Sequence, residues 1–179
     1  MKKFLLLLLL VGITAGQAQV IQLDEARIDA RAVKITSNGD EIKYLVTEEY
    51  SGQFQKNPIR FMKENFDIHQ FIAQLEGENY DNYLVEFRNR KGALKANFDS
   101  KGTLVSTAQR FKNVPLPLQV SRQLLSDHSG WSMVKNSYVA TGTGDVLDKE
   151  HYKITLKNGK STQNIKIVPD RSALGLVSN

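Results

Sequence analysis

Hydrophobic and polar residues alternate in two stretches of the chain, a pattern that is typical of half-buried β-strands. In residues 83–102 (YLVEFRNRKGALKANFDSKG), apolar residues occupy every second position from Tyr83 to Phe87, and the alternation resumes after a turn at Gly92. Residues 152–167 (YKITLKNGKSTQNIKI) repeat this arrangement around an Asn-Gly pair. Each stretch therefore predicts a β-hairpin that begins with a tyrosine and carries lysines among its polar residues.

A third alternating region lies nearer the N-terminus, where Ala26–Ser37 and Glu41–Glu48 flank the pair Asn38-Gly39. Asn-Gly favours a two-residue hairpin loop because both residues accept a positive φ. We expect an opening β-hairpin here, within a segment that spans residues 19–56.

Helical spacing follows this hairpin. From residue 57 to residue 75, apolar residues recur at steps of three and four. Asn57-Pro58 supplies a favoured N-cap and a proline at the first helical position. Asp67 can cap a second helix, so we expect a break there, and Gly77 ends the segment. The pattern leaves helix and strand open for residues 67–75.

A second helical segment follows Pro117, carries Val120 and Leu124, and ends near Gly130, a residue type that is common just after a helix. Strands with alternating or β-branched residues follow each helical segment. The predicted strands that complete the two sets are Thr103–Phe111, Ser132–Ala140, His151–Lys157 and Ser161–Val168.

These elements predict an α+β fold, an antiparallel sheet with helices packed on one face. A β-hairpin comes first, and a helix with three strands then occurs twice, which indicates a tandem repeat. We expect one α+β domain over residues 57–168, with halves at 57–112 and 113–168, and a flexible tail over residues 169–179.

The first 18 residues have the pattern of a cleaved signal peptide. Lys2-Lys3 precede a ten-residue apolar core, Phe4–Ile13, and Gly16 and Ala18 place small residues at the −3 and −1 positions of a cleavage site. Ten apolar residues are too few to cross a bilayer, which takes about 20. We expect cleavage after Ala18 and a periplasmic or secreted protein without a membrane span. The chain has no cysteine for a lipid anchor or a disulfide.

The chain is mildly basic, with a formal net charge of +5 that falls to +3 without Lys2 and Lys3. Its charges are interspersed, whereas a nucleic-acid-binding protein usually clusters them in a basic stripe. We therefore expect no nucleic-acid partner.

Several of these stretches resemble the PepSY-like family of exported bacterial proteins, also described as β-lactamase-inhibitor-like, and especially its Bacteroidetes members. The resemblance rests on YLVEFRNRKGALKANFDSKGTLVS, the helix near Pro117, GWSMV and YKITLKNGKSTQNIKI, and it covers roughly residues 57–168. In that family a tyrosine-led strand runs through a turn into a strand that ends Phe-Asp-x-x-Gly. Phe98-Asp99 and Gly102 match this ending, whereas the second half ends with Ile-Val-Pro-Asp at residues 167–170.

The resemblance implies helices packed on an antiparallel sheet, in tandem, used to bind proteins or peptides outside the cytoplasm. Inhibition of secreted enzymes is a role proposed for related domains. The resemblance implies no catalytic residue in this chain.

The sequence lacks the common catalytic and metal-binding motifs. His69, His128 and His151 lie far apart, without the short ligand spacings of a zinc site. There is no G-x-S-x-G nucleophile motif and no H-x-G-H phosphate site. We expect no enzyme activity, no cofactor and no metal, and a hydrolase with an unrecognised site stays open as an alternative.

The glycine-rich segment Thr141–Asp145 allows two binding interpretations. Its backbone amides could form an anion nest, or Asp145, Asp148 and Glu150 could hold calcium. It lacks the phosphate-loop, dinucleotide and calcium-loop patterns. We interpret it as an exposed connection between strands.

Alternation places a set of polar residues on the side of the strands opposite the apolar residues. Helices on one side of a sheet leave the other free to meet water or a partner. The set is either a solvated face whose lysines protect the sheet edges or a surface that binds an acidic partner. The candidate residues are Arg88, Lys95, Asn97, Lys153, Lys157 and Lys166.

Trp131, the only tryptophan, begins a strand directly after a helix. It either packs that helix onto the sheet or anchors a partner, whereas Tyr44, Tyr83 and Tyr152 are expected in the core. The sequence thus predicts an exported, non-enzymatic module that binds an extracytoplasmic protein or peptide and can inhibit a secreted or envelope enzyme. A structural envelope protein is the remaining alternative.

Overall fold

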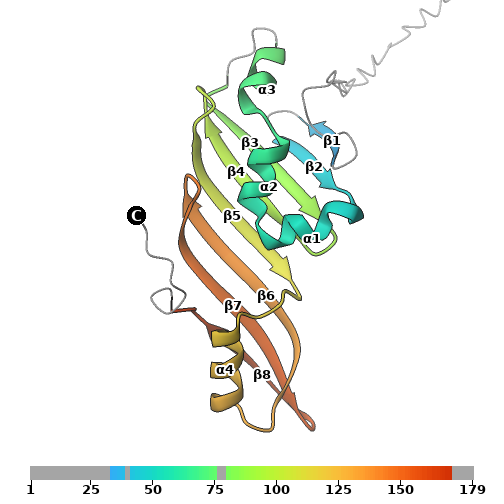
Figure 1. The fold of residues 1–179 in the computed structure, drawn as a ribbon, viewed down its shortest axis with the longest axis vertical. Helices are drawn as coiled ribbons and strands as arrows, with labels where there is room; N and C mark the ends of the chain where they lie inside the picture. Colours follow the sequence, from blue (N-terminus) through green and yellow to red (C-terminus); the bar gives the residue numbers. More distant parts are fainter. Residues whose placement is uncertain (1–32, 39–40, 76–79, 171–179) are drawn as a thin grey trace, which may run out of the picture.

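The computed structural model describes residues 33–38, 41–75 and 80–170. Within these residues, eight strands form one sheet whose spatial order follows the chain, accompanied by four helices (Figure 1). The strands are β1 (Val33–Asn38), β2 (Glu41–Val46), β3 (Asn82–Asn89), β4 (Gly92–Asp99), β5 (Leu104–Lys112), β6 (Ser132–Thr143), β7 (Val146–Asn158) and β8 (Ser161–Ile167). The helices are α1 (Glu48–Lys56), α2 (Pro58–Asn65), α3 (Ile68–Gln74) and α4 (Leu118–Asp127). The α+β class is confirmed.

Neighbouring strands are antiparallel except β2 and β3, which are parallel. The prediction of an antiparallel sheet is therefore wrong at this one pair. The connection explains the exception, because the chain passes through α1, α2 and α3 between β2 and β3, and such a crossover joins parallel strands.

The opening hairpin is confirmed between β1 and β2, with Val33 opposite Val46. The predicted signal peptide, residues 26–32 of the first predicted strand, Gly39, Gly77 and residues 171–179 of the predicted tail lie outside the described residues.

Two predicted helix starts have the expected capping geometry. The side chain of Asn57 accepts a hydrogen bond from the backbone N–H of Arg60 at 3.1 Å, and Pro58 occupies the first turn of α2. Asp67 accepts hydrogen bonds from the backbone N–H groups of His69 and Gln70 at 2.9 and 3.1 Å, so the chain breaks there and α3 begins. Residues 68–74 are therefore helical.

Helix α1 is an element that the pattern did not predict. The second predicted strand was extended to Glu48, but β2 ends at Val46 and Glu48 begins the helix. Only Ser51 and Phe54 of α1 are buried, so its sequence has no long series of apolar residues at helical spacing. Its N-cap residue, Thr47, makes no side-chain capping bond that would mark the start of the helix. Packing of Phe54 holds α1 in place.

The first core cluster lies between α1–α3 and strands β2–β5. Phe87 is fully buried at its centre, with its ring 4.7 Å from that of Tyr44 and stacked on it. The rings of Phe54 and Phe61 lie 6.5 and 6.3 Å from that of Phe87. The predicted core positions of Tyr44 and Tyr83 are confirmed.

The second core cluster lies beneath α4 and is smaller. It contains Val120 of α4 with Ile154 and Leu156 of β7 and Ile167 of β8. Tyr152 is also buried there, as predicted. None of the helices in the described part of the chain is long and apolar enough to cross a membrane.

The glycine-rich segment is part of a long β-hairpin, which corrects its interpretation as a loop. Strand β6 continues through Thr143, and only the turn at Gly144-Asp145 separates it from β7. A Cβ atom at Gly142 would lie 2.2 Å from the carbonyl oxygen of Val146, and Gly144 has a φ of +55°. The glycines therefore permit close strand pairing and a tight turn.

Candidate functional site

The sheet face that points away from the helices is the candidate functional surface, and we call it the open face. Its side chains alternate with the core residues of the same strands, so Lys153 flanks Ile154 and Lys166 flanks Ile167. The strand registers place Glu86 opposite Lys95 and Lys153 opposite Lys166. The open face thus brings together all six residues of the predicted polar set, Arg88, Lys95, Asn97, Lys153, Lys157 and Lys166.

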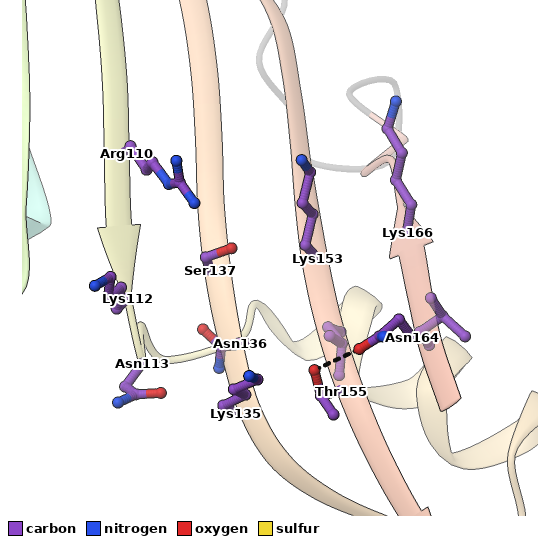
Figure 2. A pocket seen from close by; sticks show the side chains of 12 residues that line it. Arg110, Lys112, Asn113, Lys135, Asn136, Ser137, Lys153, Thr155, Asn164 and Lys166 are labelled. Atoms are coloured by element: carbon purple, nitrogen blue, oxygen red, sulfur yellow. Dashed lines mark hydrogen bonds between the residues drawn. The ribbon is translucent and has the colours of Figure 1, made fainter. Parts of the chain in front are cut away.

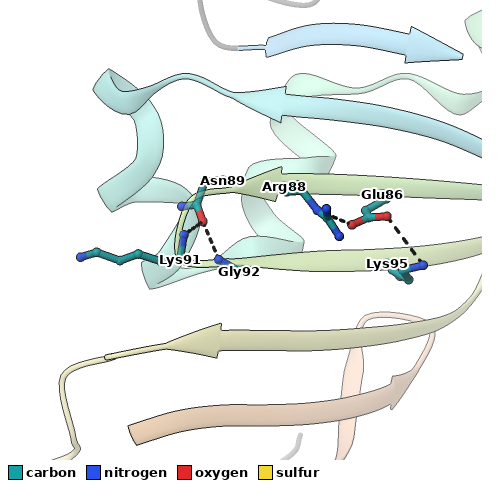
Figure 3. A network of polar contacts seen from close by, with 6 residues as sticks. All are labelled: Glu86, Arg88, Asn89, Lys91, Gly92 and Lys95. Atoms are coloured by element: carbon teal, nitrogen blue, oxygen red, sulfur yellow. Dashed lines mark hydrogen bonds and ion pairs between the residues drawn. The ribbon is translucent and has the colours of Figure 1, made fainter. Parts of the chain in front are cut away.

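In the N-terminal half of the open face, positive charges surround one buried carboxylate. The side chain of Glu86 is 2% exposed, and its Oε1 accepts a hydrogen bond from Nε of Arg88 at 2.8 Å. Nζ of Lys95, from the neighbouring strand, lies 3.6 Å from the other carboxylate oxygen (Figure 3). Here one carboxylate of the sheet pairs with two of its cations.

The C-terminal half of the open face is different, because strands β5–β8 carry seven basic and only two acidic residues. Glu150 accepts a hydrogen bond from the hydroxyl of Tyr138 at 2.8 Å, and Tyr138 pairs with the core residue Tyr152 on the helix side. Asp148 lies at a bulge and accepts from the hydroxyl of Thr143 at 2.7 Å. The basic residues are Arg110, Lys112, Lys135, Lys149, Lys153, Lys157 and Lys166.

Five of these cations surround a shallow hollow of about 550 Å³ (Figure 2). No carboxylate in the described part of the chain lines this hollow. Sequence reasoning missed three of its cations, because β5 alternates weakly and a bulge interrupts β6 near Lys135. The alternation of Arg110 and Lys112 about the buried Phe111 could have identified two of them. The lining cations are Arg110, Lys112, Lys135, Lys153 and Lys166.

His151 lies on the open face beside the hollow, opposite Val139 of β6. Its Nε2 atom is buried and has no hydrogen-bond partner among the described residues. Burial lowers the pKa of His151, and the charges of Lys166 and Lys153 lower it further. His151 is therefore neutral at pH 7.

We expect His151 to make stability depend on pH. Its folded-state pKa lies below the ordinary value of 6.5, so between these two values the unfolded chain binds more protons than the folded protein. The free energy of unfolding should therefore decrease as the pH falls through that interval, and His151→Gln should make this decrease smaller. Urea unfolding from pH 7.5 to pH 4.5 checks this, and parallel curves for the two proteins would contradict it.

Trp131 contacts the core with part of its side chain. It is half-buried and packs against the cluster beneath α4 that contains Val120 and Leu156. This contact favours a role in packing α4 onto the sheet over a role in anchoring a partner.

The acidic residues near the glycine-rich turn are engaged by other groups. Asp145 forms an ion pair with Lys63 of α2, which lowers the pKa of its carboxyl. The described residues include no group of three or more His, Cys, Asp or Glu side chains that could hold a metal ion.

A cleft of about 1120 Å³ lies on the other side of the sheet, between α1–α2 and the connection from β5 to α4. Phe111, Tyr138 and Tyr152 line it, and the pair of Lys63 and Asp145 lies at its edge. Burial, and then the charge of Glu150, raises the pKa of Tyr152 to about 12. This phenol is therefore protonated at neutral pH and cannot act there as a base.

No protein-family model, curated protein or solved structure matches this chain. The features that bear on function are those of the chain itself, a cationic hollow that no described carboxylate lines on one side of the sheet and a cleft on the other.

Proposed function

We propose that this protein is an exported, non-enzymatic module that binds an acidic protein or peptide through the open face. The observation that carries the proposal is the cationic half of that face, where β5–β8 carry seven basic residues. Five of them line the hollow, and no carboxylate of the described residues lines it with them. Complementary charge speeds the encounter with an acidic partner and selects against basic ones. Such a module could inhibit an enzyme by covering part of its surface.

The resemblance to PepSY-like proteins supports the same role. The order α1–α3 with β3–β5, followed by α4 with β6–β8, is compatible with two related halves. A tandem unit of this kind would present one continuous sheet face to a partner.

Export is the second part of the proposal and rests on the basic start, the short apolar core and the small residues before Gln19. We expect the mature protein to begin at Gln19 and to lie outside the cytoplasm. N-terminal sequencing of protein from the extracytoplasmic fraction checks this, and an intact Met1 would contradict it.

Replacing Lys95, Lys153, Lys157 and Lys166 together by glutamine should weaken the attraction to acidic partners, since it removes three of the seven basic residues of β5–β8. Surface substitutions usually change the free energy of unfolding by no more than about 0.5 kcal/mol each. Lys95 also contacts the buried carboxylate of Glu86, but Arg88 stays paired with that carboxylate, so the variant should stay folded. Association with a recombinant acidic protein, followed by surface plasmon resonance, should be slower for the variant. The wild-type rate should fall steeply with salt, because exposed charges are screened beyond about 10 Å at 0.1 M ionic strength.

Trp131→Phe is the control for this experiment, since it keeps an aromatic ring in the core contact and leaves the charges unchanged. If it lost binding while the four-lysine variant bound normally, the tryptophan rather than the open face would be the binding surface.

A further inference from the structure

One row of side chains crosses strands β5–β8 on the open face. Lys112 lies directly opposite Ser137, and Ser137 lies opposite Lys153 on the next strand. Lys153 in turn lies opposite Lys166 on β8. Neighbouring strands are about 4.8 Å apart, so the row spans about 14 Å. Figure 2 shows the side chains of Lys153 and Lys166 extending in the same direction from neighbouring strands.

This row lowers the stability of the free protein. Like charges directly opposite each other on neighbouring strands are destabilising, and Lys153 and Lys166 form such a pair. In the N-terminal half of the same face, Arg88 and Lys95 are both paired with the carboxylate of Glu86. No described carboxylate pairs with the lysines of the row. A negatively charged partner would supply the carboxylates that the described residues do not place beside these lysines.

Neutral hydrogen-bonding groups complete the surroundings of the row. Ser137 lies within it, and Thr155 and Asn164, which pair with each other two residues away from Lys153 and Lys166, line the same hollow. The hydroxyl of Thr155 bonds to the carbonyl oxygen of the Asn164 amide at 2.7 Å. This contact uses the acceptor atom of the amide, so the amide nitrogen is left as a donor. The hollow therefore presents donors and positive charge.

The length of the row indicates a segment rather than a single ion. In an extended peptide, side chains at alternate positions point the same way, and three of them cover about 13 Å at about 3.3 Å per residue. This matches the span from Lys112 to Lys166, whereas one small oxyanion would contact only part of the row. Lysine ammonium groups are flexible point charges, so the site would respond to the spacing of charges rather than to bidentate geometry.

We propose that the row of Lys112, Ser137, Lys153 and Lys166 binds an extended acidic segment whose alternate carboxylates lie across β5–β8. This inference rests on the proposed function and assigns it to one part of the open face.

The test compares two triple variants with the same loss of charge. The first, Lys112→Gln, Lys153→Gln and Lys166→Gln, removes the amines of the row. The second, Lys95→Gln, Lys149→Gln and Lys157→Gln, changes the open face outside the hollow. The probe is a synthetic peptide of alternating glutamate and serine, titrated into the complete protein by calorimetry, with inorganic phosphate and polyphosphate as comparison ligands. Thermal melts confirm that each variant is folded.

We expect the first variant to weaken peptide binding by about tenfold or more, since it removes three charge contacts, and the second variant to weaken it much less. Phosphate should bind far more weakly than the peptide. Equal losses in both variants would mean that only net charge matters, and tighter binding of polyphosphate would mean that the ligand class is wrong.

Two further outcomes separate this inference from the proposed function. If only the second variant lost binding, the row would be the wrong site while the open face would still be the binding surface. If neither variant lost binding, both the inference and the proposed function would be overturned.

Discussion

Replacing Phe87 by alanine should lower the free energy of unfolding by about 3–5 kcal/mol, the largest effect that we expect from a single substitution. Phe87 is 0% exposed, and the rings of four other aromatic residues lie within 6.5 Å of its own, as measured between ring centroids. Its removal would leave a cavity where α1, α2 and β2 meet β3. Urea unfolding followed by circular dichroism measures the loss.

Leu125→Ala is the control for Phe87→Ala. Leu125 also lies in an ordered element, α4, but is 71% exposed, so its truncation should change the free energy of unfolding by no more than about 0.5 kcal/mol. If the two substitutions had similar effects, the aromatic cluster would not be the main core of the fold.

The second large effect concerns the buried carboxylate of Glu86. Replacing Arg88 and Lys95 together by glutamine would leave a carboxylate that is 2% exposed without its two cations. Breaking a buried pair from one side usually costs about 3–5 kcal/mol. We expect about 2–3 kcal/mol here, because Lys43 lies opposite Glu86 on β2 and can take over part of the pairing.

Glu86→Gln is the informative comparison, because it removes the buried charge and leaves Arg88 and Lys95, which are 57% and 47% exposed and can be hydrated. It should therefore be less destabilising than the double substitution. Urea unfolding of both variants measures the two losses of unfolding free energy. A larger loss for Glu86→Gln than for the double substitution would show that the carboxylate is not buried in solution.

The parts of the fold that could be predicted from the sequence are those in which one local signal determines the structure. Asn57-Pro58 and Asp67 determine where α2 and α3 begin, because their side chains satisfy free backbone N–H groups. The turn between β7 and β8 lies at Gly159-Lys160, one residue later than the predicted Asn158-Gly159 pair, and it determines the register of the two strands; Gly159 has a φ of +56°.

The elements that could not be predicted depend on contacts between distant residues. Helix α1 is held by Phe54, whose neighbours Phe61, Phe87 and Phe111 come from three other elements. The parallel pairing of β2 with β3 follows from the crossover that α1 makes possible. Neither feature has a local signature in the sequence.

The candidate surface could be predicted only in part, because it also depends on contacts between distant residues. Alternation identified Lys153 and Lys166 as neighbours of core residues, but not that they face each other across two strands. Lys112 and Lys135 join them only because β5 and β6 pair between the two halves of the chain. Register, which no local pattern determines between distant strands, therefore decides where the charges gather.

An NMR titration tests most directly whether the open face is the binding surface. Addition of the alternating glutamate and serine peptide to isotope-labelled protein should shift the signals of Lys112, Ser137, Lys153 and Lys166 most. The signals should return when salt is added, as expected for screened charges. Shifts concentrated at Phe111, Tyr138 and Tyr152, which line the cleft on the helix side, would contradict the proposal and place the binding site on the opposite face of the sheet.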